Sequence, residues 1–223
     1  MTLLKRSPAL SLSGASRFAA ARLKALRAAL LAAFATLALL PAPALARDWQ
    51  PSERIETYAV TGATGIDLYR SIGDRAPSAG VGQAIAFTDF ELLWSRDYRP
   101  QPDGSCILAS ARPSLTIIYR WPVAPSGLAP DVAASWARFI AGVEKHERVH
   151  GDHVIEMTEK IQAFSTGLSA PADADCNKVR AKLQEFLAGM AAERLARARA
   201  FDRDEMGNGG NVHQLILALV NGP

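Results

Sequence analysis

The sequence predicts an α+β fold, in which a small antiparallel sheet in the N-terminal half packs on a long C-terminal helical hairpin. In residues 47–125, short segments alternate apolar and polar side chains, as half-buried strands do. From Asp131 onward, apolar residues and histidines recur at steps of three and four, which is the period of one helix face. Residues 47–223 are therefore expected to form one domain with a β-rich half, 47–125, and a helical half, 126–223.

Four segments of the first half are predicted to be strands. They are rich in aromatic and β-branched residues and are bounded by turn-forming residues: Ile55–Val60, Ala84–Asp97, Cys106–Ala111 and Leu115–Trp121. A short helix that begins at Thr64 or Gly65 is expected between the first two. Because the connections are too short for helical crossovers, we expect antiparallel pairing.

The second half is predicted to contain two long helices. The first runs from about Asp131, after a proline suited to the first helical turn, to Phe164. The segment Gly167–Pro171 breaks it. The second helix is expected from Asp173 or Asp175 to about Ala200, followed by a glycine-rich loop and a short apolar tail over 212–220.

Residues 1–46 have the layout of a signal peptide. A basic segment ends at Arg27, an uncharged apolar run covers residues 28–40, and Ala44-Leu45-Ala46 supplies small residues for cleavage after Ala46. The apolar run is shorter than the roughly 20 residues that span a bilayer. An uncleaved N-terminal anchor is the alternative. In either case the body is expected to be exported, to a periplasmic or extracellular space, with no membrane contact once the leader is cleaved.

The net charge of +3 comes from this leader. Six of the 25 basic residues lie there with no acid, which leaves 19 bases against 22 acids in residues 47–223. This body has neither a basic stripe nor interleaved aromatic residues, and we therefore expect no nucleic-acid partner.

The two cysteines, Cys106 and Cys176, both lie in the exported part. One pair in an oxidising compartment predicts a single disulfide. Two free buried thiols are the alternative. Closing a loop of this length would stabilise the chain by about 4 kcal/mol in the chain-entropy model.

The strongest chemical motif is His146-Glu147-Arg148-Val149-His150. On a helix, His146 and His150 lie one turn apart on one face and can bind the same Zn²⁺. Glu147 lies beside that face, where it can act as a general base that removes a proton from the attacking water. The motif therefore predicts a zinc metallopeptidase.

The third metal ligand is less defined. His153 shares the face, but its Cα lies about 10.5 Å along an ideal helix from that of His146, and Gly151 would have to let the helix bend. His153 is our first choice. The alternatives are other acidic residues and a histidine of the helical half: Glu156, Glu159, Glu185, Glu193, Asp202 and His213.

Two further residues are candidates for accessory roles. Asp152 could accept a hydrogen bond from an imidazole that binds the metal, or could simply be solvated. His213 follows the glycine-rich loop and could reach the metal as an oxyanion donor, although an exposed histidine is the simpler interpretation.

The chain resembles the family of predicted secreted bacterial zinc-dependent proteases. The likeness is carried by the strand Leu115–Pro122, the helix from Trp136 to His153, and the segment Phe201-Asp202-Arg203-Asp204. It implies a catalytic His-Glu-x-x-His, here His146, Glu147 and His150, and a zinc ion. Members continue with aromatic-Asp-x-x-Thr and then His-Gly. This chain lacks that threonine and histidine.

The predicted function is hydrolysis of peptide bonds in a peptide or protein substrate. Two other functions fit the same motif: an exported metal-binding or scaffolding protein without turnover, and a zinc amidase that acts on cell-wall peptides.

Overall fold

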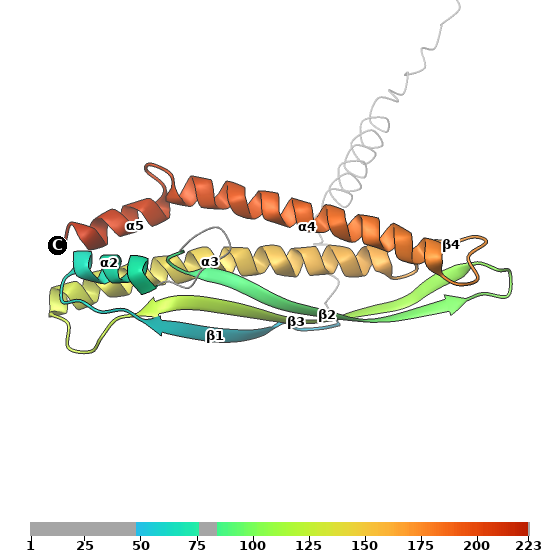
Figure 1. The fold of residues 1–223 in the computed structure, drawn as a ribbon, viewed down its shortest axis with the longest axis horizontal. Helices are drawn as coiled ribbons and strands as arrows, with labels where there is room; N and C mark the ends of the chain where they lie inside the picture. Colours follow the sequence, from blue (N-terminus) through green and yellow to red (C-terminus); the bar gives the residue numbers. More distant parts are fainter. Residues whose placement is uncertain (1–47, 76–83, 223) are drawn as a thin grey trace, which may run out of the picture. The chain divides into compact units, whose positions relative to one another are not determined.

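The computed structural model describes residues 48–75 and 84–222; the expected signal peptide, residues 1–46, lies outside them. The elements follow in the order β1 (Ser52–Ala59), α2 (Gly65–Arg75), β2 (Phe87–Pro100), β3 (Cys106–Val123), α3 (Pro130–Ser165), β4 (Ser169–Ala170), α4 (Asn177–Met206) and α5 (Asn211–Val220) (Figure 1). The α+β class is confirmed. Within the described ranges, no helix combines the length and apolar character needed to cross a bilayer.

The sheet has β3 at its centre, with β1 on one side and β2 on the other. β2 and β3 form the expected antiparallel hairpin, and the two-residue β4 pairs antiparallel with the start of β3. β1 corrects the prediction, because it pairs with β3 in parallel, from Ser52 opposite Thr116 to Ala59 opposite Val123. The expectation rested on connections too short for a helical crossover, whereas α2 and β2 both lie between β1 and its partner and make the connection long enough for parallel pairing.

β3 is one continuous strand of 18 residues, although two strands were predicted on either side of Pro113. Proline is disfavoured inside a sheet because it has no N–H to donate. Here β1 begins to pair only at Thr116, and β4 pairs only with Cys106 and Ile107. At Pro113, β2 is therefore the only neighbouring strand among the described residues.

α3 lies along one face of the sheet, and α4 runs antiparallel to it (Figure 1). The main core forms between α3 and β3, where Phe139, Val143 and Val154 meet Ile117 and Tyr119. α3 spans Pro130–Ser165, almost as predicted, and passes through Gly151 without a break. The expected tail over residues 212–220 is the helix α5, whose Leu219 is buried in the same core.

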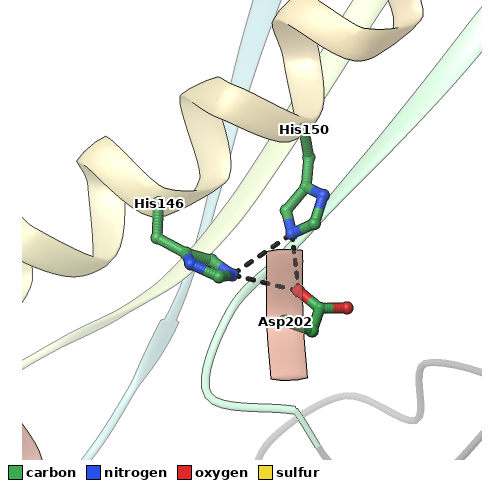
Figure 2. A group of neighbouring side chains, drawn as sticks. All are labelled: His146, His150 and Asp202. Carbon is green, nitrogen blue, oxygen red and sulfur yellow. Dashed lines mark hydrogen bonds and ion pairs between the residues drawn. The ribbon is translucent and has the colours of Figure 1, made fainter. Parts of the chain in front are cut away.

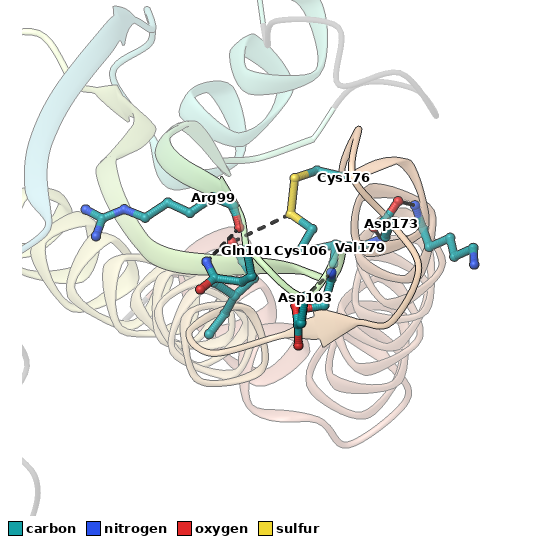
Figure 3. The surroundings of a disulfide bond; sticks show 10 residues. Arg99, Gln101, Asp103, Cys106, Asp173, Cys176 and Val179 are labelled. Atoms are coloured by element: carbon teal, nitrogen blue, oxygen red, sulfur yellow. Dashed lines mark hydrogen bonds between the residues drawn. A yellow bond between two sulfur atoms is a disulfide. The ribbon is translucent and has the colours of Figure 1, made fainter.

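The predicted disulfide is confirmed: Cys106, at the start of β3, is bonded to Cys176, just before α4 (Figure 3). Both residues belong to a second apolar cluster with Leu108, Val179 and Leu183. α4 begins later than predicted, because Asp173 does not enter the helix but caps it. Its carboxylate accepts the backbone N–H groups of Lys178 and Val179, each at 2.9 Å.

Candidate metal centre

His146 and His150 lie one turn apart on α3 and point to the same side (Figure 2). The side chain of His146 is 6% exposed and that of His150 is 16% exposed. Their ring centroids are 4.9 Å apart, with the rings nearly perpendicular. As the helical spacing predicts, both Nε2 atoms reach one point beside the helix.

Asp202 supplies the third side chain, from α4 (Figure 2). It is 52 residues from His150 in the sequence, and the antiparallel register of the two helices brings it there. The same register is seen further along, where Lys160 pairs with Glu193 and Glu156 pairs with Arg197. Four residues backward along α3 correspond to four residues forward along α4.

The three facing atoms are closely spaced. His150 Nε2 lies 2.9 Å from Asp202 Oδ1, His146 Nε2 lies 3.2 Å from the same oxygen, and the two Nε2 atoms are 3.2 Å apart. Ligands held 2.0–2.1 Å from a tetrahedral zinc are separated from one another by about 3.3 Å. Among the described residues, this is the group of His, Cys, Asp and Glu side chains that can hold a metal ion.

The site favours a negative charge on Asp202. Burial opposes that charge, but hydrogen bonds with both imidazoles outweigh it and hold the pKa of Asp202 well below its usual range. Burial likewise acts to lower the pKa of His150, yet the Asp202 carboxylate and the Glu147 charge together raise it. The carboxylate is therefore an ionised oxygen donor that faces two nitrogens.

A second layer of side chains orients His146. Phe201, which precedes Asp202, stacks on its ring with centroids 4.7 Å apart and an angle of 18° between planes. On the other side, His146 Nδ1 is buried without a hydrogen-bond partner among the described residues, and Glu205 Oε2 lies 3.8 Å from it. A carboxylate behind a metal-binding imidazole is a common means of fixing its tautomer.

Glu147 is 4% exposed, and Thr88 on β2 holds it in place. The Thr88 hydroxyl donates to Glu147 Oε2 at 2.7 Å and also lies 2.9 Å from the Glu147 carbonyl oxygen. Burial raises the pKa of Glu147, against the Thr88 hydrogen bond and the two histidines, which lower it. A carboxylate whose pKa is raised by burial is suited to accepting a proton near neutral pH.

Glu147 and the three facing side chains line one cavity of about 300 Å³. Its other walls are mostly apolar and come from the start of β2, from Val154 of α3 and from α4. They include Phe87, Val154, Leu195, Ala198 and Met206, together with the guanidinium of Arg194. Leu195 and Met206 are 41% and 43% exposed, so the cavity has an open apolar rim.

Gly151 allows α3 to approach the sheet behind the site. A Cβ at position 151 would overlap the hydroxyl of Tyr119 and lie 3.1 Å from its Cζ. Gly151 and Tyr119 are both buried. The guanidinium of Arg148 lies over the Tyr119 ring, 5.0 Å from its centroid, and pairs with Glu53.

His153 does not join the three facing side chains. Its ring centroid lies 6.1 Å from that of His150, and it lines a separate space of about 10 Å³ with Met157 and Arg197. Burial and the charge of Arg197 lower the pKa of His153. Because α3 stays helical through Gly151, His153 remains about two turns along the axis from His146. The position proposed for it is taken by Asp202, one of the six alternatives.

The two accessory candidates also lie elsewhere. Asp152 is exposed on α3 and forms no hydrogen bond with an imidazole of the described chain. His213 lies in the first turn of α5, and its Nδ1 accepts the backbone N–H of Gly209 at 3.2 Å. It closes the turn between α4 and α5 and does not line the metal-site cavity.

Sequence reasoning did not identify the roles of Thr88, Arg194 and Glu205. Thr88 is an ordinary strand residue, and only the packing of β2 on α3 brings it to Glu147. Glu205 stands where the resembled family has threonine, three residues after Asp202, and that departure was the available signal. The charge pairs Lys160–Glu193 and Glu156–Arg197 follow the register that brings Asp202 to His150, but they can be recognised as pairs only once the structure is known.

Comparison with known proteins identifies a family and no individual relative. No curated protein matches the chain, and no solved structure matches it either. The family described as "Bacterial protein of unknown function (DUF922)" matches residues 55–210, which include both helices that contribute to the site. The chain belongs to the DUF922 family of bacterial proteins of unknown function.

Proposed function

We propose that the chain is an exported zinc-dependent peptidase, with His146, His150 and Asp202 as metal ligands and Glu147 as general base. The observation that carries the proposal is the spacing of three donor atoms, 2.9–3.2 Å apart, on two different helices. Two imidazoles and one carboxylate, with a fourth position left for water, form the ligand set of catalytic zinc sites.

The residues present fit a zinc ion. The donors are two neutral imidazole nitrogens and an ionised carboxylate, which zinc prefers. Both Nε2 atoms face the third ligand, so Nδ1 would carry the proton in each ring when a metal is bound, and in His146 the nearest carboxylate oxygen, Glu205 Oε2, lies 3.8 Å from Nδ1. That distance is longer than a hydrogen bond, and Nδ1 is buried without a hydrogen-bond partner in the described structure.

Zinc bound by such a set lowers the pKa of a water and polarises a substrate carbonyl. Glu147 lines the same cavity and would accept a proton from the water that attacks the scissile carbonyl carbon. The protonated Glu147 would then give this proton to the amine nitrogen as the C–N bond breaks. Thr88 keeps the carboxylate in place through both transfers by donating to Oε2.

The cavity supports the proposal of a peptide substrate. A volume of about 300 Å³ with apolar walls is sufficient for one or two amino-acid side chains beside the scissile bond. Export is supported by the leader in the sequence and by the disulfide, since structural disulfides belong to oxidising compartments.

The test combines metal analysis with a peptide library. The purified chain is expected to carry about one zinc per molecule and to cleave library peptides. Glu147→Gln should keep the zinc and lower kcat by about 10²–10⁴-fold. Glu144→Gln is the matched control, since Glu144 lies on the same helix but does not line the cavity. This control should leave the zinc content and kcat unchanged.

Each other outcome supports a different function. Absence of zinc would overturn the metal centre. Bound zinc without turnover on any peptide would favour a metal-binding or scaffolding protein. Cleavage restricted to cell-wall peptides would favour an amidase. Full activity of Glu147→Gln would exclude Glu147 as the base.

A further inference from the structure

A second hollow lies between β2 and α4, away from the metal-site cavity. It has a volume of about 350 Å³ and is lined by Trp94, Arg96, Tyr98, Arg180 and Gln184. None of these residues lines the metal-site cavity. From Thr88, which contacts Glu147, to Arg96 is eight residues of β2, or about 26 Å at 3.3 Å per residue. The hollow is therefore separate from the metal-site cavity.

Its positive charge comes from two guanidinium groups that lie on aromatic rings. Arg180 lies 3.8 Å from the centroid of Tyr98, and Arg96 lies 5.2 Å from that of Trp94. No carboxylate of the described residues pairs with either arginine. Arg96 Nε is also buried without a hydrogen-bond partner there. Arg99 differs, because it pairs with Asp97 on the same strand at 2.6 Å.

The rings that carry these arginines are fixed in place. Trp94 and Tyr98 pack against the apolar cluster that contains both cysteines of the disulfide. Arg180 follows Cys176 by one helical turn, and its backbone N–H bonds to the Cys176 carbonyl. The donors are thus held before any ligand arrives, which lowers the entropic cost of binding.

A third pair of the same kind lies closer to the metal site. Arg194 on α4 lies over Phe90 of β2, 5.3 Å from the ring centroid, and also lines the metal-site cavity. The three rings, Phe90, Trp94 and Tyr98, are four residues apart on β2. Three guanidinium groups that pair with no carboxylate among residues 48–75 and 84–222 therefore follow the side of β2 next to α4 for about 26 Å, from the metal-site cavity to the second hollow.

We propose that the hollow between β2 and α4 binds an acidic segment of polypeptide, whose carboxylates contact Arg96 and Arg180. Guanidinium groups with free N–H donors bind carboxylates in a bidentate manner. A small anion could contact one end of this arrangement, whereas an extended chain can contact all of it. The proposal concerns binding alone and does not depend on catalysis or on a metal.

The test uses the full chain with Glu147→Gln, so that the probe is not cleaved. The probe is a fluorescently labelled peptide of about ten residues, long enough to span the arginines at 3.3 Å per residue. It alternates Glu and Ala and has both ends blocked. Binding is followed by anisotropy. We expect the Glu peptide to bind at about 0.01 M ionic strength and its affinity to fall strongly at about 1 M. At low ionic strength its affinity should exceed that of the matched peptide with Gln in place of Glu.

Variants locate the site. Arg96→Gln with Arg180→Gln should weaken binding by about tenfold or more, because a hydrogen bond to a charged group is worth at least that factor. Arg54→Gln with Arg99→Gln removes the same charge from arginines that are already paired, and should change affinity less than about twofold. Circular dichroism checks the fold of each variant.

Three results would overturn the proposal: no binding of the Glu peptide, equal binding of the Glu and Gln peptides, or an equal loss in the control pair. The comparison of the two peptides on the parent chain needs no arginine variant. It stays decisive if the Arg96 and Arg180 variant does not fold.

Discussion

The Thr88 hydroxyl on β2 donates to the carboxylate of Glu147 on α3, with 2.7 Å between Oγ1 and Oε2. The two residues are 59 positions apart in the sequence, and they join the edge strand of the sheet to the helix that carries the candidate metal ligands. Because Glu147 is buried, this donor is a main source of stabilisation for its charge.

Replacing Thr88 by valine keeps the shape of the side chain and removes the donor. A lost hydrogen bond to a buried charged group costs roughly 1.5–3 kcal/mol, so kcat should fall by about tenfold to a hundredfold while zinc content is unchanged. Thr88→Ser keeps the hydroxyl and should stay near the parent value. Steady-state kinetics on a substrate from the peptide library decides. Equal activity of the valine and serine variants would remove Thr88 from the mechanism.

The choice between Asp202 and His153 as third ligand predicts opposite effects on zinc affinity. Asp202→Ala removes a facing oxygen 2.9 Å from His150 Nε2 and should weaken zinc binding by more than the roughly 10–100-fold that loss of an outer-shell partner causes. His153→Ala should change affinity little, because His153 lines a separate space. Competition with a chromogenic chelator measures both. A larger loss for His153→Ala would reverse the assignment.

The close approach of Gly151 to Tyr119 predicts a steric cost. Gly151→Ala should destabilise the fold by about 1–3 kcal/mol, since its Cβ would overlap the Tyr119 hydroxyl. Adding Tyr119→Phe should recover part of the loss. Gly189, inside α4, has open space around it, and Gly189→Ala should stabilise by roughly 0.5–1 kcal/mol. Urea unfolding of the parent and the three variants tests this. Similar effects at both glycines would contradict the packing argument.

Removal of the disulfide should be costly because of the chain length it closes. Cys106 and Cys176 are 70 residues apart, and the chain-entropy model gives a loss of about 4 kcal/mol for the double alanine variant. Denaturant unfolding of the parent with and without reductant provides the matched comparison. A loss below about 1 kcal/mol would show that the apolar cluster alone holds the start of α4.

Asp173 predicts a pH-dependent contribution to stability. Burial works against its charge, but the backbone N–H groups of Lys178 and Val179 lower its pKa. The folded-state pKa then lies below the unfolded value of about 3.9, so this stabilisation is present above that pH and is lost as the pH falls through the folded-state pKa. Asp173→Asn should therefore be less stable than the parent near pH 7, and the difference should shrink below about pH 4. A difference independent of pH would contradict this capping role.

The local parts of the site could be read from the sequence, because helical periodicity alone decides them. His146 and His150 share one face of α3 whatever α3 packs against, and the same helical period places Glu147 beside that face. Asp202, the third side chain of the group, could not be assigned, because its place depends on the register between α3 and α4. The connection between them, residues 166–176, contains β4 and the disulfide-bonded Cys176, and no local pattern encodes the offset that it gives the two helices.

The sheet shows the same division between local and long-range information. The local pattern predicted strands within β1, β2 and β3, but not the two-residue β4, which lies in the expected helix break Gly167–Pro171. The direction of β1 depends on its partner, which follows α2 and β2 in the sequence. Two strands were predicted where β3 is continuous through Pro113, a residue without an N–H to donate. The break is absent because β1 begins its pairing only at Thr116, and that register belongs to the assembled sheet.

The disulfide ties the start of α4 to β3, and the donor atoms of His146, His150 and Asp202 offer a second tie, between α4 and α3. Asp202 is 26 residues beyond Cys176, about 39 Å along α4 at 1.5 Å per residue. A bound ion would hold the distal part of α4 as the bridge holds its start. Chelation should then loosen α4 from its distal end inward, with amide exchange fastest around Phe201 and slowest near Val179.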